Sequence, residues 1–220
     1  MRTGILSTIV ILAALLAGPS VARSNHRGNA PGPQDASFDY YVLSLSWSPA
    51  YCESHRTDTV QCGATRYGFV LHGLWPEGAS GRNPDTCRSA FTLDDSARSL
   101  GRSIFPSEKL VAHEWDKHGT CSGLDASAYF QQADSARNLI HIPDVLKPGS
   151  SKRTMSASEL SSLLRDANPG LPSKSLAITC AQGKLSEVRV CLDKNLAPIA
   201  CQTGVRNSCG AGAIEILGVN

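Results

Sequence analysis

The part of the sequence richest in acid–base chemistry is the short segment 113–121, which reads HEWDKHGTC. A helix turns by about 100° per residue, so this spacing brings two imidazoles, one carboxylate and one ammonium onto a single face: His113, Glu114, Lys117 and His118. An ordinary helix surface rarely gathers four such groups. Because Glu114 and His118 lie four residues apart, we expect the carboxylate to orient the imidazole and to raise its pKa.

Three kinds of site could use this face. Its first two residues resemble the HExxH motif of zinc proteases, in which the two histidines lie one helical turn apart. Here the second position holds Lys117, whose ammonium cannot bind a metal, and the next histidine comes one residue later. A solvated charged face, with Trp115 packed inward, is the simplest alternative. The third interpretation is acid–base catalysis on a phosphate, in which Lys117 and His113 neutralise phosphoryl oxygens and His118 moves protons.

The sequence offers this site no nucleophile of its own. It contains no GxSxG elbow, no P-loop and no acidic cluster for magnesium, and its cysteines are expected in disulfides. RNA carries its own nucleophile, because its 2′-hydroxyl lies beside the scissile phosphate. Cleavage by that hydroxyl needs a base for the 2′-oxygen and an acid for the leaving 5′-oxygen, so a second histidine is required.

His72 is the leading candidate for the second histidine. It follows the apolar run 68–71 and opens the segment HGLWPE, where Gly73 would let the backbone approach a ligand and Trp75 offers a flat face for a base. Taken alone, such a histidine is more often structural and such a tryptophan more often part of the core. The other histidines are interpreted as surface residues: His26, His55 and His141.

Two strands must position this part of the chain. Alternating apolar residues predict a half-buried strand over 41–47, ended by Pro49. A second strand is predicted over 68–72, with Gly73 and Pro76 as breakers, which places His72 at a strand end.

The middle and the end of the chain complete the fold class. Helix signals mark three segments, the third with a capping box of Ser156 and Glu159: 107–118, 125–139 and 156–167. Strand signals then return at 176–180, 188–192 and 213–217. Strands, then helices, then strands without regular alternation indicate an α+β fold with a central, mainly antiparallel sheet and helices packed on it.

Residues 1–22 are expected to be a secretory signal peptide, with a basic start, an apolar run and small residues before the cut. A membrane anchor is the alternative, but Gly18 and Pro19 interrupt the run before the roughly 20 residues that a span needs. Residues 23–36 are rich in Asn, Gly and Pro and are expected to be a disordered mature N-terminus, followed by a single catalytic domain over 37–220. We therefore expect a soluble protein, secreted to the periplasm or outside the cell.

Eight cysteines behind an export signal indicate an oxidising compartment and up to four disulfides. Their grouping favours Cys52 with Cys62 and leaves the last four to pair among themselves, so that Cys87 would join Cys121. Zinc binding is the alternative, but the sequence has no CxxC spacing. The net charge is only +2, so affinity for a nucleic acid would have to come from a few placed cations and from stacking.

Two segments, FVLHGLWP at 69–76 and HEWDKHGTC at 113–121, resemble the two active-site segments of the ribonuclease T2 family. The segment LSWSP at 45–49 and the late cysteines extend the resemblance over about residues 38–210. The resemblance implies an α+β fold and an endoribonuclease that cleaves single-stranded RNA through a 2′,3′-cyclic phosphate, with low base specificity and no metal. We expect a monomer without cofactors whose partner is single-stranded RNA.

The resemblance also implies a role for each residue of the site. His118 would be the base that activates the 2′-oxygen, and His72 the acid that protonates the leaving 5′-oxygen; the two would exchange roles when water opens the cyclic phosphate. Glu114 and Lys117 would stabilise the pentacoordinate phosphorane, and His113 would bind phosphate.

For the base upstream of the cut, the resemblance implies stacking on Trp75, near Glu77. Aspartate is common in the family at the latter position, so the longer side chain leaves base preference open. A binding or toxin-like protein that keeps the scaffold without the chemistry is the main alternative, and the intact site residues weigh against it. The family's disulfide pattern pairs Cys52 with Cys62, Cys87 with Cys121, Cys180 with Cys209, and Cys191 with Cys201.

Overall fold

The computed structural model describes residues 37–219. The expected signal peptide (1–22) and N-terminal tail (23–36) lie outside the described residues and stay predictions. Within the described part of the chain, no helix is both long and apolar enough to cross a membrane.

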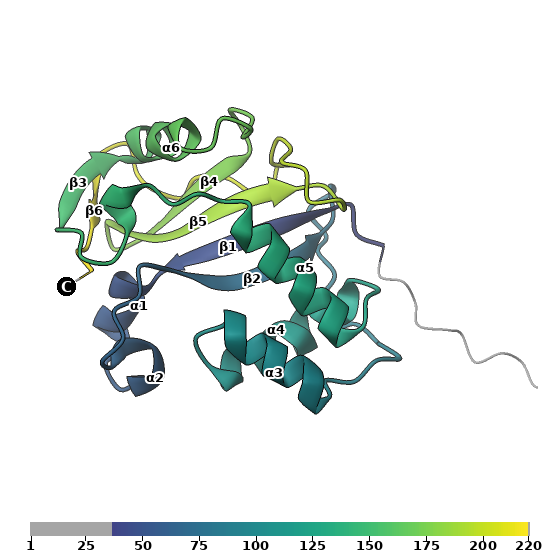
Figure 1. Ribbon diagram of the computed structural model, residues 1–220. Coiled ribbons are helices and arrows are strands. Elements are labelled where there is room, and N and C mark those ends of the chain that lie inside the picture. The colour runs from purple at the N-terminus through teal and green to yellow at the C-terminus, as the bar shows by residue number, and fades with distance from the viewer. Residues whose placement is uncertain (1–36, 220) are drawn as a thin grey trace, which may run out of the picture. The chain divides into compact units, whose positions relative to one another are not determined.

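One six-stranded sheet forms the centre of the described chain (Figure 1). Its strands are β1 (Tyr40–Trp47), β2 (Phe69–Glu77), β3 (Arg153–Ser156), β4 (Leu176–Ala181), β5 (Lys184–Leu192) and β6 (Ala213–Ile216). Their spatial order is β2-β1-β5-β6-β3, and β4 pairs with β5 beside that path. Paired strands run antiparallel except β5 and β6, which meet in parallel at a single residue pair. The predicted α+β class with a mainly antiparallel sheet is confirmed.

Helices lie on this sheet in two groups. In Figure 1, α3, α4 and α5 gather beside β1 and β2, while α6 lies beside β3 and β4. The helices are α1 (Ser48–Ser54), α2 (Thr59–Cys62), α3 (Asp95–Ile104), α4 (Glu108–Lys117), α5 (Ala126–Asn138) and α6 (Ala157–Asp166), with 3-10 turns η1 (Gly119–Cys121) and η2 (Asp144–Leu146).

Local capping signals explain where the later helices begin. The side chains of Ser107 and Asp125 each accept a hydrogen bond from the backbone nitrogen three residues on. Ser156 and Glu159 form the predicted capping box. These contacts confirm the three predicted helices, α4, α5 and α6. Helix α3 was not predicted, because the residues it buries are an alanine, a glycine and one isoleucine, which give little apolar periodicity.

Strand β1 is buried on both faces, so the prediction of a half-buried strand is wrong. One face joins the main core, in the same cluster as the aromatic residues of α4 and α5. The other face carries Val42, which packs with Trp75 in a smaller cluster, and Ser44, whose side chain is fully enclosed. The second layer over this face comes from segments far away in the sequence, which the alternation of one strand does not reveal.

His72 occupies a β-bulge inside β2 and not a strand end, which corrects the prediction. The register pairs Ser44 with Gly73 but Leu45 with Leu71, and so leaves His72 as the extra residue. A bulge bends its strand and redirects the side chain at that point. The bulge is therefore what turns the imidazole out of the regular alternation of the strand.

The strand also continues past both predicted breakers. It runs through Gly73 and Pro76 and ends only at Glu77. Because β2 lies at the edge of the sheet, a proline without an amide hydrogen is tolerated there.

All eight cysteines form disulfides, in the pairing that the family pattern implies. The first bond links α1 to α2, and the second ties the loop before α3 to η1, directly after the segment 113–118. The third bond links β4 to the segment before β6, and the fourth links β5 to the segment that follows it. The pairs are Cys52–Cys62, Cys87–Cys121, Cys180–Cys209 and Cys191–Cys201.

Candidate active site

Three elements bring their polar side chains to one place. Strand β2 contributes His72, the end of α4 contributes Glu114 and His118, and β5 contributes a glutamate and an arginine. The imidazole Nε2 of His72 lies 4.0 Å from Glu114 Oε1. The rings of His72 and His118 both lie against the indole of Trp75, with centroids 5.1 and 5.3 Å away. The structure thus brings the two predicted histidines together at Trp75, with the carboxylate of Glu114 beside one of them, His72.

Glu114 is a fully buried carboxylate with one hydrogen bond. Trp75 Nε1 donates to its Oε2 at 2.9 Å. Its Oε1 has no hydrogen-bond partner among residues 37–219. Burial raises the pKa of Glu114 to about 7, against the opposing charge of His72. Gly73 leaves room for this arrangement, because a Cβ there would overlap both Glu114 Oε2 and Trp75 Nε1.

The predicted pairing of Glu114 with His118 is wrong. His118 lies one residue beyond the helix as its C-cap, and its ring stacks on Trp75 at an interplanar angle of 29°. Burial, followed by the charge of Lys117, lowers the pKa of His118 to about 4, the opposite of the expected direction. Its Nδ1 is buried without a hydrogen-bond partner in the described chain, so Nε2 is the nitrogen that a substrate can reach.

His72 has the opposite electrostatic environment. Burial by itself lowers its pKa, but the hydrogen bond and charge of Glu187, together with the charge of Glu114, outweigh burial and raise it. The contact from His72 Nδ1 to Glu187 Oε1 is 2.5 Å. The pKa values of the two imidazoles are therefore shifted in opposite directions, that of His118 downward and that of His72 upward.

Sequence reasoning missed Glu187 and Arg189, both on β5. Arg189 donates from Nε and Nη2 to Glu187 Oε2, at 2.9 and 2.7 Å. Despite burial, the contacts with His72 and Arg189 lower the pKa of Glu187 to about 2. The available signal was the alternation of β5, since Val188 and Val190 enter the core and the two residues that alternate with them face the other way.

Lys117 and His113 lie at the rim of the site. Lys117 Nζ lies 3.3 Å from Asp85 Oδ2, and both side chains are substantially exposed. His113 is exposed on the same helix, with its ring centroid 6.5 Å from that of His118. Both are therefore accessible to an anionic ligand.

The two residues expected to meet a base are less open. Trp75 is only 9% exposed, and the guanidinium of Arg189 lies 5.1 Å from the centre of its ring. Glu77 is half-buried, and burial raises its pKa to about 7 although Arg189 opposes this. Base stacking on Trp75 stays a prediction, because His118 and Arg189 pack against its ring in this structure.

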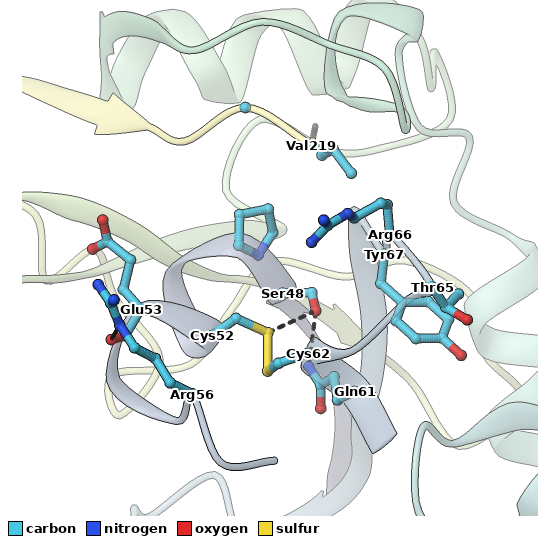
Figure 2. A pocket seen from close by; sticks show the side chains of 12 residues that line it. Ser48, Cys52, Glu53, Arg56, Gln61, Cys62, Thr65, Arg66, Tyr67 and Val219 are labelled. Carbon is cyan, nitrogen blue, oxygen red and sulfur yellow. Dashed lines mark hydrogen bonds between the residues drawn. A yellow bond between two sulfur atoms is a disulfide. The ribbon is translucent and has the colours of Figure 1, made fainter. Parts of the chain in front are cut away.

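Two cavities lie near these elements. One of about 560 Å³ opens beside His72 and His113 and reaches α1 and α2. Figure 2 shows the other, of about 370 Å³, beside the disulfide Cys52–Cys62; two arginines but no histidine are among the described residues that line it. Within residues 37–219, no three His, Cys, Asp or Glu side chains gather closely enough to hold a metal ion.

Together these features define a class of site: two imidazoles that meet at one tryptophan, a buried carboxylate beside one of them, and an exposed lysine and histidine at the rim. Comparison with known proteins gives the family. A family model of the ribonuclease T2 family matches residues 38–201. The chain belongs to the ribonuclease T2 family, which confirms the resemblance found in its two histidine segments.

Curated relatives agree with this assignment. A probable ribonuclease of Haemophilus influenzae is 31% identical over 199 residues, covering 83% of this chain and 67% of the relative. A ribonuclease of Aeromonas hydrophila is 39% identical over 129 residues, covering 59% of this chain and 57% of the relative. Family membership and these relatives support an endoribonuclease of the T2 type.

Solved structures share the fold. Ribonuclease MC1 from bitter gourd seeds superposes with a TM-score of 0.63 at 26% identity, covering 82% of this chain and all of its own. Ribonuclease NT, solved in complex with 5′-AMP, gives a TM-score of 0.62 at 24% identity, covering 82% of this chain and 98% of its own.

Proposed function

We propose that this chain cleaves single-stranded RNA by transesterification, through a 2′,3′-cyclic phosphate, without a metal and with low base specificity. The observation that carries the proposal is the meeting of two imidazoles at Trp75, one of them with its Nε2 4.0 Å from the buried carboxylate of Glu114; their opposite pKa shifts support it. With a pKa of about 4, His118 is neutral near neutral pH and ready to accept a proton. With a raised pKa, His72 keeps the proton that it must donate.

In the first step, His118 Nε2 takes the proton of the 2′-hydroxyl while the 2′-oxygen attacks phosphorus. The bond from phosphorus to the 5′-oxygen breaks, and that oxygen receives the proton of His72 Nε2. The cyclic phosphate remains on the upstream fragment. In the second step, His72 deprotonates a water that attacks phosphorus, and His118 returns its proton to the 2′-oxygen.

The remaining residues stabilise the charge that develops on phosphorus. Lys117 and His113, at the exposed rim, bind non-bridging oxygens of the phosphate. Glu114 Oε1 lies 4.0 Å from Nε2 of His72, the proposed acid. Together with Lys117, Glu114 stabilises the phosphorane. The base upstream of the cut binds beside Trp75 and Glu77, after the side chains packed against the indole have moved.

The proposal also covers the compartment, the oligomeric state and the partner of the enzyme. Four disulfides suit an oxidising compartment, so we place the protein in the periplasm or outside the cell, as a monomer. Single-stranded RNA is the partner; ribonuclease NT, a structural neighbour, was solved with 5′-AMP.

The test uses purified protein and a single-stranded RNA in excess EDTA. We expect fragments that end in cyclic phosphate, and an RNA with one deoxyribose at the cut should resist. His72→Ala and His118→Ala should each lose about 10²-fold or more in rate while keeping wild-type thermal unfolding. Inhibition by EDTA, or near wild-type cleavage by either variant, would contradict the mechanism. A folded wild-type protein that binds RNA without cutting it would favour the binding-protein alternative.

A further inference from the structure

We propose that Glu187, held in place by Arg189, is a positioning residue that anchors the imidazolium of His72 by its Nδ1 and so directs Nε2 toward the leaving oxygen. This inference rests on the proposed role of His72 as the acid. It adds a residue from β5 to a site that the sequence located only on β2 and α4.

The geometry of Glu187 is that of a fixed support. Its carboxylate is buried, and Oε1 contacts His72 Nδ1 at 2.5 Å. Ser46, its register partner on β1, donates to the same oxygen at 3.4 Å. Arg189 donates twice to Oε2. Because groups from β2 and β1 hold Oε1 and Arg189 of its own strand holds Oε2, Glu187 has little freedom to move.

The bulge makes such a support necessary. His72 is the unmatched residue of β2, so the regular strand pairing does not fix its side chain. A carboxylate on Nδ1 holds one tautomer of the imidazole and one ring orientation, and it stabilises the charged form. The nitrogen left for the substrate is Nε2, which lies on the side of Glu114.

The charges around His72 come from several elements. Strand β5 presents Glu187 and Arg189, α4 presents Glu114, and the residue that caps α4 is His118. Ser46, from β1, is neutral. His72 also lines the cavity of about 560 Å³ that reaches α1, α2 and α4. The other titratable residues that line this cavity are Tyr51, His55, Asp58, Lys109 and His113.

Among these groups, Glu187 is the anion in hydrogen-bond contact with His72. The contacts with His72 and Arg189 lower its pKa to about 2, and the two hydrogen bonds from Arg189 do not depend on the proton of His72. The proton that moves is therefore the one on Nε2, which passes to the 5′-oxygen, while the Nδ1 hydrogen stays on the ring.

The experiment compares Glu187→Gln with wild type by NMR titration of the His72 ring in the free protein and by the pH profile of kcat/KM on RNA. Glutamine retains an acceptor for Nδ1 but removes the charge. We expect the pKa of His72 to fall and the alkaline limb of kcat/KM to move with it to lower pH. We also expect kcat/KM near neutral pH to drop by about 10- to 100-fold, less than the about 10²- to 10⁴-fold contribution of one acid–base group, because His72 itself is still present. The acid limb, set by His118, should not move.

Glu215→Gln is the matched control, because that glutamate is paired with Lys152 away from the site. It should leave both the titration and the profile unchanged. Wild-type nitrogen NMR adds a measurement that needs no variant, since neutral His72 should carry its hydrogen on Nδ1. Neutral His72 with its hydrogen on Nε2, or unchanged titration and profile in folded Glu187→Gln, overturns the inference. If His72→Ala keeps its activity, the proposed function fails instead.

Discussion

Replacing Glu114 by glutamine should stabilise the fold while impairing catalysis. The carboxyl is fully buried, and its pKa rises from 4.5 in the unfolded chain to about 7 in the fold. Each pH unit between these values corresponds to about 1.36 kcal/mol, which gives about 3 kcal/mol in total. Because the folded pKa is raised, the stabilising effect of the protonated carboxyl is complete below pH 4.5 and is lost as the pH rises through 7.

Glutamine cannot ionise, so Glu114→Gln avoids this loss. Its amide oxygen still accepts the hydrogen bond from Trp75 Nε1. The free energy of unfolding of the variant, relative to wild type, should therefore increase by about 2 to 3 kcal/mol between pH 5 and pH 8. Cleavage of RNA should fall most toward pH 8, where wild-type Glu114 is ionised and the variant lacks the charge beside His72.

Urea unfolding at the two pH values measures the effect. Taking differences from wild type at each pH removes the contributions of other titrating groups. Glu108→Gln on the same helix is the control, because that side chain is exposed and paired with Arg98 and Arg102, and it should show no such gain. If the stability of Glu114→Gln relative to wild type stays constant or falls from pH 5 to pH 8, the buried carboxylate is better stabilised than we infer.

Two further predictions concern the pH profile and the packing of the site. The value of kcat/KM should rise with pH through about 4, where His118 becomes neutral, and fall above the raised pKa of His72; a profile with no acid limb near 4 would contradict the first assignment. Gly73→Ala should cost about 1 to 3 kcal/mol in urea unfolding and most of the activity, because its Cβ overlaps Glu114 Oε2. Gly170→Ala has open space and should match wild type, and equal stability of the two variants would refute the packing argument.

The features that could be predicted from the sequence are local ones. Each helix cap is a hydrogen bond between residues only three positions apart, so a short segment is enough to predict where a helix begins. This holds for the starts of α4, α5 and α6, which are capped by Ser107, Asp125 and the Ser156–Glu159 capping box. Helical spacing likewise indicates Glu114 and Lys117 as neighbours on α4, but the predicted face shared with His118 does not form, because the helix ends at Lys117.

What the sequence did not show depends on partners far along the chain. The bulge at His72 arises from the register between β1 and β2. The contact with Glu187 arises because β5 pairs with the other edge of β1. The carboxylate of Glu114 therefore lies beside His72 and Trp75 and not beside His118. The pKa of His118 is lowered, whereas the spacing of Glu114 and His118 predicts that it is raised.

The central claim is that His118 is the base and His72 the acid in the first step. The most direct test compares kcat/KM of His72→Ala and His118→Ala on a dinucleotide and on a uridine 3′-phosphodiester whose leaving group is p-nitrophenol. That leaving group departs without a proton, so His72→Ala should regain most of its lost activity on the activated substrate, while His118→Ala should stay impaired. Recovery by His118→Ala instead, or equal defects of both variants on both substrates, would contradict the assignment.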